Sequence, residues 1–551
     1  MKRRFAKVGA HLAGVCLAGA APLVSLSAGA APPPFVPSDA LDASSLPELG
    51  ADLRSRTSTW IEVHGDLRAR GELLGNLDLD RGTTPSGQPL FAVPLGDPKA
   101  QWLTSADMRL RTDVALFAPG GHVAVRMRLD FLDNHALGSA PVGPVVAATS
   151  QAPPSSPATL RRAYAEVLAP FGVVAVGRMG SQWGLGLLSA SGDHPDSDAG
   201  DAADRIAVVS PLFGHVLAVA YDFAAIGAQA PHPANGRWLD RTPQDDVRTV
   251  TFAALHYTPH QALMRRRAVG RSTLDYGGYA SYRWQDVDFP GGSASRTATR
   301  ATQATHATQA AQAVQRGLQA VAGDLWLRLD TPRWLLQAEA AVLSSRIAEP
   351  TLLPGALYRQ PVEGLQWGGE VQARFRPHDA GLGVGLDFGV ASGDPDPGFS
   401  GAPERNLGPT QAGELHGAQV DLPRDRRADD FRFHPDHRVD RILFREIVGT
   451  VTDAAWVKPQ VRWLVQDFGA GSLTLALQAV ASMALYAEST PGGRHPLGIE
   501  IEPGLDYRTR DGFGFALHHA VLFPLAGLDN PAQGLSARPA QLLQVRLHQR
   551  F

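Results

Sequence analysis

Hydrophobic and polar residues alternate with a period of two in several long segments of the chain. In residues 60–74, apolar side chains at odd positions from Ile61 to Leu73 alternate with polar ones at even positions from Glu62 to Glu72. Residues 106–116 and 122–131 repeat the pattern. Such alternation predicts β-strands with one apolar and one polar face. Runs of about ten to fifteen residues exceed the usual length of soluble strands and match strands that cross a bilayer.

The connections between the predicted strands are alternately short and long. Short turns include Ala118–Gly121 and Arg510–Gly512, whereas long polar connections include Asp288–Leu318 and Ser392–Asp440. Short turns on one side and long loops on the other are typical of outer-membrane barrels. The pattern therefore predicts an all-β fold, a transmembrane antiparallel β-barrel of about 18 strands. The number is 16 if Leu263–Val287, which contains three consecutive arginines, holds no strand.

The first residues predict export from the cytoplasm. Four basic residues within residues 2–7 precede an apolar stretch from Val8 to about Leu26, and Ala28-Gly29-Ala30 offers a cleavage site. We expect a signal peptide at 1–30, with a membrane anchor helix as the alternative. The domain prediction continues with a Pro/Ala-rich periplasmic leader at 31–59 and a barrel at 60–551.

Cysteine content and charge narrow the candidate chemistry. Cys16 is the only cysteine and leaves with the signal peptide, so we expect neither a disulfide nor a cysteine-ligated metal in the mature chain. Without the four basic residues of the signal, 47 of the 51 basic residues remain against 54 acidic ones. This acidic balance argues against a nucleic-acid partner. The mean hydropathy of −0.12 is consistent with membrane crossing by strands rather than by apolar helices.

Arginines cluster near the middle of the polar face of the first three strands. A charged residue on the lipid face at mid-membrane costs about 2–4 kcal/mol, so this face is predicted to line the lumen. In a ring of about 18 strands, the wall opposite lies near Asp324, Asp330, Glu339 and Glu370, which would set up a transverse field. As an alternative, arginines and neighbouring acids neutralise each other in a plug-like network. The predicted pore-lining residues of the first three strands are Arg68, Arg70, Arg109, Arg111, Arg126, Arg128, Asp66, Asp107, Asp113 and Asp130.

An acidic segment after the fifth predicted strand is a candidate calcium site. It contains Asp193, Asp196, Asp198 and Asp201 on a glycine-containing loop. Closely spaced carboxylates on a flexible loop suit Ca²⁺, which takes six to eight oxygen ligands, although the spacing fits no EF-hand. A solvated acidic loop is the alternative, and no other cofactor is predicted.

Two further constellations contain residue types used in catalysis or metal binding. His434 and His437, near Asp436 and Asp440, could ligate a transition metal or lie on an ordinary surface loop. Ser189, Ser191, Asp193 and His194 contain the types that a hydrolase needs. Neighbours on one loop seldom converge as nucleophile and base, and no nucleophile motif is present, so we expect no enzyme.

Aromatic residues mark the predicted strand ends and the end of the chain. Six tryptophans near strand ends fit an interfacial girdle, with a core or sugar-stacking role as the alternative for Trp183. The last segment places Leu543, Val545, Leu547 and Phe551 on one face, which resembles the assembly signal of bacterial outer-membrane barrels. The six tryptophans are Trp60, Trp102, Trp183, Trp284, Trp334 and Trp367.

From Trp60 to Phe551 the chain resembles porin-type outer-membrane barrels of Gram-negative bacteria. Within them it is similar to a family of predicted barrels from myxobacteria and their relatives, and that resemblance implies a location and a fold but no activity. The residues that carry the narrower likeness are Gly177-Arg178-Met179, Trp183-Gly184-Leu185-Gly186, the acidic run Asp193 to Asp204-Arg205, and Phe433 to Asp440 leading into Leu443-Phe444-Arg445-Glu446.

Taken together, these patterns favour a channel in the outer membrane. We expect passive passage of small polar or charged solutes, with outer-membrane lipid and the barrel-assembly machinery as partners. The alternatives are a plugged structural or adhesive barrel and an outer-membrane hydrolase. A barrel of this size usually encloses a water-filled lumen, which favours the channel.

Overall fold

A computed structural model describes residues 49–50, 53, 57–96, 101–137, 158–224, 229–288, 314–350, 360–376, 381–400, 410–417, 420 and 425–551. The predicted signal peptide, most of the predicted leader and most of the Ala/Thr/Gln-rich tract at 293–320 lie outside these residues. Residues 34–551 belong to one compact unit. No described helix is long and apolar enough to span a membrane.

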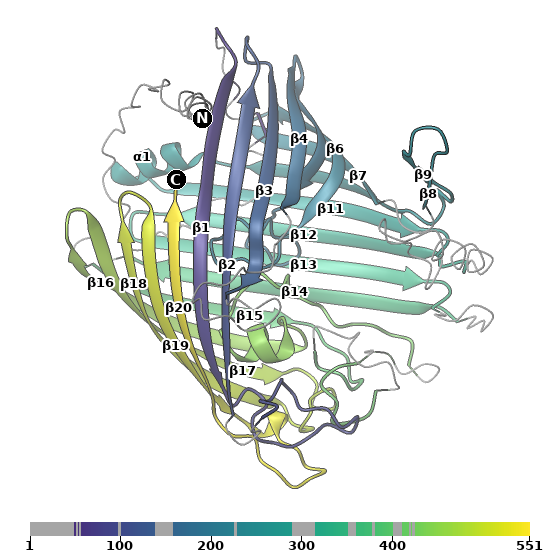
Figure 1. The fold of residues 1–551 in the computed structure, drawn as a ribbon, viewed down its shortest axis with the longest axis vertical. Helices are drawn as coiled ribbons and strands as arrows, with labels where there is room; N and C mark the ends of the chain where they lie inside the picture. The colour runs from purple at the N-terminus through teal and green to yellow at the C-terminus, as the bar shows by residue number, and fades with distance from the viewer. Residues whose placement is uncertain are drawn as a thin grey trace, which may run out of the picture. The chain divides into compact units, whose positions relative to one another are not determined.

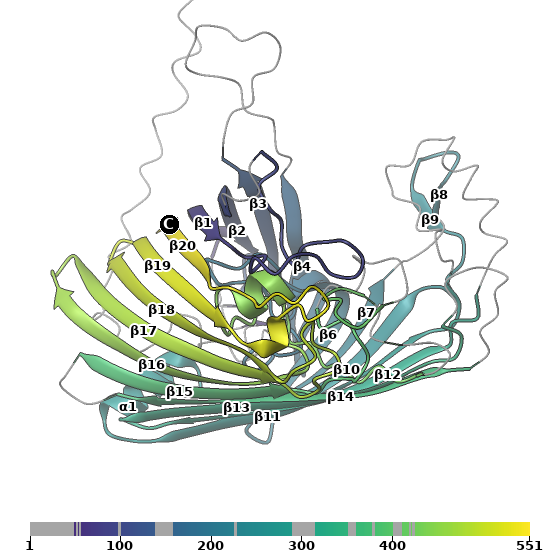
Figure 2. The same cartoon turned by 90° about the horizontal axis from the view of Figure 1, so that it is seen from below.

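Eighteen antiparallel strands form one closed sheet (Figures 1 and 2). Each strand pairs with the next along the chain, and the last pairs with the first, so the barrel has no free edge. The predicted fold class and strand number are therefore confirmed. The barrel strands are β1 (Trp60–Gly75), β2 (Trp102–Phe117), β3 (Val123–Ala136), β4 (Thr159–Ala169), β5 (Gly172–Gly180), β6 (Ala202–Leu212), β7 (His215–Ala224), β10 (Val247–His256), β11 (Thr273–Gln285), β12 (Leu318–Asp330), β13 (Trp334–Ile347), β14 (Val362–Phe375), β15 (Leu382–Ala391), β16 (Ala454–Asp467), β17 (Gly471–Ala484), β18 (Pro496–Thr509), β19 (Phe513–Pro524) and β20 (Ala540–Arg550).

Elements outside the barrel wall are few among the described residues. The long connection between β7 and β10 contains a small hairpin, β8 (Gln229–Pro231) and β9 (Trp238–Asp240). A helix, α1 (His260–Ala268), follows β10, a π-helix, η3 (Leu443–Val448), precedes β16, and a 3-10 turn, η4 (Ala526–Leu528), follows β19. In Figure 2, η3 lies inside the ring of strands.

Helix α1 corrects the sequence prediction for Leu263–Val287. The three arginines of that stretch form the last turn of the helix, where positive side chains are stabilised by the negative end of the helix dipole. The strand β11 begins only at Thr273. Arginine has a strong helix propensity, and three in succession cannot alternate between a polar and an apolar face.

The outer face of the barrel is apolar, as the alternation predicts. Leu325, Leu477 and Val371, for example, point outward with more than half of their side-chain surface exposed. Trp60, Trp102, Trp334 and Trp367 are half-exposed at or near strand ends, as a girdle requires. Trp183 departs from this prediction, because it is buried inside the barrel. A closed barrel with this outer face is the architecture of a transmembrane β-barrel of the outer-membrane type.

The end of the chain closes the barrel. Phe551 and Gly65 exchange two backbone hydrogen bonds, each of 3.0 Å, beyond the last paired residue of β20. A Cβ on residue 65 would lie 2.5 Å from the Phe551 ring. Glycine is therefore required at this seam, because the terminal ring packs directly over it.

Candidate functional site

The inner wall formed by β1, β2 and β3 carries the six predicted arginines, which we call the basic wall (Arg68, Arg70, Arg109, Arg111, Arg126 and Arg128). Strand register places them together, since Arg68 pairs with Arg109 and Asp66 with Arg111 across the first two strands. The next pair of strands places Arg111 opposite Asp130. The alternation of the sequence thus brings the predicted residues together on one patch of the interior.

Most arginines of the basic wall bind a carboxylate on a neighbouring strand. Arg111 makes two hydrogen bonds of 2.8 Å to Asp130, and Arg128 makes bonds of 2.6 and 2.9 Å to Asp113. Arg70 bonds Asp107 at 2.8 Å, as Arg126 does Glu166. Two-point contacts of this kind fix the planes of both groups. Within the wall, the geometry matches the salt-bridge alternative rather than a row of unpaired cations.

The connection between β5 and β6, residues 181–201, lies inside the barrel, and we call it the inner loop. Its backbone carbonyls accept hydrogen bonds from the basic wall. Gly192 accepts from Arg111 at 2.6 Å, while Pro195 and Ser197 accept from both Arg68 and Arg109. Arg68 and Arg109 are fully buried beneath the inner loop. The sequence pattern predicts a long external connection over Ser181–Ala203. Its docking inside the barrel over residues 181–201 corrects that prediction.

Asp196, on the inner loop, contacts four guanidinium groups. They belong to Arg438, Arg546, Arg70 and Arg445, at 2.6, 3.0, 3.2 and 3.2 Å. Burial opposes ionisation, but these charges outweigh it and hold the pKa of Asp196 well below its usual value. Asp196 is therefore a stable anion that joins three separate parts of the chain.

Asp198 shares several of the same arginines but is partly exposed. It bonds Arg70 at 2.9 Å and Arg438 at 3.0 Å. Burial raises its pKa, but the hydrogen bond from Arg70 and the nearby positive charges lower it to about 2. Asp198 is thus ionised at any physiological pH.

The opposite end of the inner loop is fixed to β12 and β13. We call the inward carboxylates Asp324, Glu339 and Glu370 of β12, β13 and β14 the acidic wall. Trp183 donates its indole N–H to Asp324 at 2.9 Å. Glu339 accepts from the backbone N–H groups of Leu185 and, at 3.2 Å, Leu187. Gly184 has a φ of 53°, and a Cβ there would collide with the Glu339 carboxylate. The inner loop therefore spans the lumen from the acidic wall to the basic wall.

A second segment, residues 425–453, also lies inside the barrel, and we call it the inner segment. Phe431, Phe433 and Phe444 are buried in an apolar cluster that includes side chains of β16 to β20. Glu500 of β18 accepts hydrogen bonds from the backbone N–H groups of Ile442 and Leu443. The inner segment therefore has both an apolar and a polar attachment to the wall.

His437 connects the inner segment to the acidic wall. Its Nε2 forms an ion pair with Glu370, and its Nδ1 lies 3.1 Å from the carbonyl of Leu185. Burial lowers the pKa of His437, but the charge of Glu370 outweighs burial and raises the pKa above its usual value. His437 therefore holds the inner loop and the inner segment together on the acidic wall.

Some charged groups inside the barrel remain exposed to water. The side chains of Asp193, Asp201 and Asp198 are 49, 45 and 33% exposed. Asp113 on the basic wall is 39% exposed. The surface that the inner loop presents to the remaining interior is therefore acidic and hydrated.

The carboxylates of the predicted calcium site mostly pair with arginines in the structure. Asp193 pairs with Arg128 and Arg162, while Asp196 and Asp198 pair with the arginines above. These carboxylates neutralise guanidinium groups and do not converge on a common point. The predicted calcium site at Asp193, Asp196, Asp198 and Asp201 stays a prediction. Arginine is the partner that the geometry gives the first three, whereas Asp201 lies beside His434.

The metal and hydrolase candidates are not assembled in the expected way. His434 lies 3.4 Å from Asp201, whereas His437 binds Glu370 on the other side. Ser191 donates to Asp193 at 2.5 Å. The Nδ1 of His194 accepts the backbone N–H of Asp196 at 3.0 Å, so this nitrogen already has a partner other than the serine.

Three arginines that complete the network were not predicted from the sequence. Arg438 lies in the connection Ser392–Asp440, whose length and polarity predict an external loop. Arg445 lies just beyond it in η3, and Arg546 lies on β20. The polar positions Gln544 and Arg546 do alternate with apolar ones, so the alternation of the last strand is the signal that could have placed Arg546 inside. Nothing local in the sequence shows that Arg438 turns inward.

Residues of the predicted leader also contact the barrel interior. The backbone N–H of Gly50 donates to Glu166 at 3.1 Å, and Leu49 packs against the apolar clusters near Val209 and Ala175. Gly50 has a φ of 78°, which favours glycine. Leu49 and Gly50 thus lie against the inner faces of β4 to β6.

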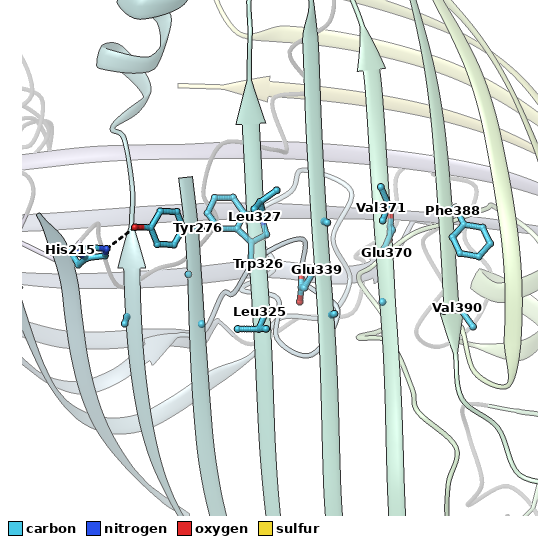
Figure 3. Close-up of a pocket in the computed structure, with 16 residues that line it drawn as sticks. His215, Tyr276, Leu325, Trp326, Leu327, Glu339, Glu370, Val371, Phe388 and Val390 are labelled. Carbon is cyan, nitrogen blue, oxygen red and sulfur yellow. Dashed lines mark hydrogen bonds between the residues drawn. The ribbon is translucent and has the colours of Figure 1, made fainter. Parts of the chain in front are cut away.

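A hollow of about 750 Å³ lies against the outer face of β10 to β15, and its lining residues include Glu339 and Glu370, which also hold the inner loop and His437 (Figure 3). Its lining is almost entirely apolar, with exposed side chains such as Leu325, Val371 and Phe388 around small residues such as Ala340 and Gly369. At its edge, the ring of His215 lies 2.9 Å from the Tyr276 hydroxyl. Leu325, Val371 and Phe388 face the lipid side of the wall, so the hollow opens toward that side.

Comparison with known proteins gives a likeness of fold only. No protein-family model and no curated protein matches the chain, so the narrower resemblance to myxobacterial barrels has no support. Among solved structures, OpdK of Pseudomonas aeruginosa with vanillate is 10% identical, with a TM-score of 0.42 over 89% of this chain and 98% of that one.

Two other solved structures give similar values. A BenF-like porin from Pseudomonas fluorescens Pf-5 is 9% identical, with a TM-score of 0.44 over 90% of this chain and all of that one. OmpT of Vibrio cholerae is 9% identical, with a TM-score of 0.33 over 91% of this chain and all of that one. At these values the assignment as an outer-membrane barrel rests on the strand pairing and the apolar outer face.

Proposed function

We propose that the protein is a porin-like channel for small polar or charged solutes. The observation that carries this proposal is the exposure of Asp193, Asp198 and Asp201 inside the barrel, beside a wall of arginines. Each of these carboxylates also pairs with an arginine or a histidine, and the exposed part of its side chain faces open space inside the barrel, which in a barrel of this size is filled with water. A hydrated surface bearing both signs of charge favours polar solutes and excludes apolar ones.

The inner loop and the inner segment narrow the path in this proposal. Their attachment to both walls divides the lumen, and a solute must pass the exposed carboxylates of the inner loop. Most arginines of the basic wall are already paired, so they position the loop more than they attract solutes. We therefore expect weak selectivity among ions rather than strong selectivity for anions.

Conductance in planar bilayers tests the proposal. The refolded barrel should give discrete current steps, and Asp193→Asn with Asp201→Asn should shift the reversal potential in a salt gradient towards anions. Arg109→Ser with Arg126→Ser should shift it towards cations. Asp511→Asn, on a short turn remote from the inner loop, is the matched control. A correctly folded barrel that stays silent would refute the channel.

A plugged structural barrel is the second candidate, favoured by the apolar cluster of the inner segment around Phe431, Phe433 and Phe444. Deleting residues 430–450 separates the two candidates. A channel should already conduct before the deletion, whereas a plugged barrel should conduct only after it. An assay of the purified barrel for esterase and protease activity tests the hydrolase alternative.

A further inference from the structure

The hollow on the outer face of the barrel follows from the register of four neighbouring strands. Ala340 of β13 pairs with Gly369 of β14, and both occupy outward-facing positions. In the same row across the sheet, Leu325 of β12 and Val390 of β15 stand on either side of this pair. Two small residues between two large ones leave a depression in the apolar surface. Its volume of about 750 Å³ lies within the range of about 300–1,000 Å³ that is usual for ligand sites.

One end of the hollow is polar (Figure 3). The neighbouring outward row of the sheet begins with His256 and Tyr276, which pair across β10 and β11. Their rings stack with centroids 5.3 Å apart, and the Tyr276 hydroxyl lies 2.9 Å from Nε2 of His215. Aromatic side chains with a polar group belong at the level of the lipid headgroups rather than in the hydrocarbon. This end of the hollow therefore lies at the boundary of the membrane.

The helix α1 adds positive charge at the same end. It connects β10 to β11, the two strands that carry the stacked rings, and it contacts β11. Arg265 and Arg266 in α1 and Arg271 just after it are exposed. In the described part of the chain, none of these three pairs with a carboxylate, whereas Arg267 lies 3.7 Å from Asp330. Exposed arginines without a partner at the edge of a membrane attract anionic headgroups.

We propose that the hollow and α1 together bind one anionic phospholipid, with an acyl chain in the hollow and the phosphate at the exposed arginines. The hollow by itself suits any apolar group, and the arginines suit any anion. A phospholipid carries both parts in this order, and lipid is what the outer face of the barrel contacts. The connection between β10 and β11 is on the side of the short turns, which faces the periplasm in such barrels. The lipid therefore belongs to the periplasmic leaflet. This inference does not depend on the channel function.

Native mass spectrometry of the refolded full-length barrel tests the headgroup. The probes are phosphatidylglycerol, which is anionic, and zwitterionic phosphatidylcholine with the same acyl chains. We expect one retained phosphatidylglycerol, bound at least about tenfold more tightly than phosphatidylcholine. Arg265→Gln and Arg266→Gln should each weaken its binding about fivefold, the contribution of one arginine at an anionic surface. Arg510→Gln is the matched control, because it removes the same charge from the short turn between β18 and β19.

A second pair of variants tests the hollow. Ala340→Leu places a larger side chain in the hollow and should weaken the binding of both lipids. Ala479→Leu makes the same change on the outer face of β17, opposite Ile501 and remote from the hollow, and should bind lipid as the wild type does. Heat-modifiable migration checks that each variant has folded.

Phosphatidylglycerol with a photoactivatable group at the end of its acyl chain locates the bound lipid. Labelling should concentrate at Leu325 and Phe388, and this readout needs no variant. Equal retention of the two lipids by the wild type, or labelling spread evenly around the barrel, would overturn the proposal. So would a dimer that forms without lipid and dissociates in Ala340→Leu, because a second copy of the chain would then cover the hollow.

Discussion

Replacing Asp196 by asparagine tests whether this carboxylate holds the inner loop in place. The change keeps the shape of the side chain and removes one negative charge from contact with four guanidinium groups at 2.6–3.2 Å. Breaking a buried ion pair by removing one partner costs about 3–5 kcal/mol. The barrel itself should persist, because its closure rests on backbone hydrogen bonds between strands.

The cost falls on the docked state of the inner loop. Since about 1.4 kcal/mol corresponds to a factor of ten, an undocked loop should become roughly 100- to 5,000-fold more populated. In planar bilayers we expect larger or strongly fluctuating conductance in Asp196→Asn. The loss of a negative charge among arginines should also shift selectivity towards anions.

Asp198→Asn is the matched control, since it removes the same charge from the same loop. Its side chain is one-third exposed, so solvent screening reduces the expected cost to about 1 kcal/mol or less. The two variants should therefore differ clearly in gating while they change selectivity in the same direction. Equal gating in both, or no change in Asp196→Asn, would refute the assignment of Asp196 as the centre of the network.

Three further predictions concern the anchors of the interior and the seam of the barrel. Gly184→Val should release the inner loop from Glu339 and expose Trp183, seen as a red shift of tryptophan fluorescence, whereas Gly214→Val on an open turn should not. The pKa of His437 is higher in the folded protein than its unfolded value of about 6.5. The stability that its ion pair gives is therefore fully present below about pH 6.5 and is lost as the pH rises through the pKa of the folded state. In the wild type, channel fluctuations should accordingly increase as the pH rises above about 6.5. In His437→Gln the fluctuations should not depend on pH in this range. The same pH response in both proteins would contradict this role of His437. Deleting Phe551 should sharply reduce the heat-modifiable barrel, and normal assembly would show that the terminal contact with Gly65 is dispensable.

The barrel can be predicted from the sequence because its strands are determined by local patterns, namely the alternation of side chains and the lengths of the connections. Alternation with a period of two determines which side chains face lipid, and this alternation alone is enough to place Arg68 and Arg109 on the interior. Connection lengths indicate the strand number, and of the stretch Leu263–Val287 only the part before β11 departs from the prediction. In that part the chain forms α1 rather than a strand, because three consecutive arginines cannot alternate between a polar and an apolar face.

The interior depends on contacts between residues far apart in the sequence. The position of Asp196 was visible in the acidic run, but calcium and arginine are both reasonable partners for a carboxylate on a loop. Its partners Arg438 and Arg546 are more than two hundred positions away. Pairing of this kind depends on which loops fold into the barrel, and the periodicity of the sequence does not predict the direction in which a loop folds.

By itself, the sequence determined a membrane barrel with a charged interior, because the lipid and the strand period constrain every residue of the wall. Only the tertiary structure decided what occupies that interior. The inner loop folds inward because Glu339 and Asp324 hold one end and the arginines neutralise the other. Those energies arise when buried charges from distant segments meet, so they exist only once the barrel has closed.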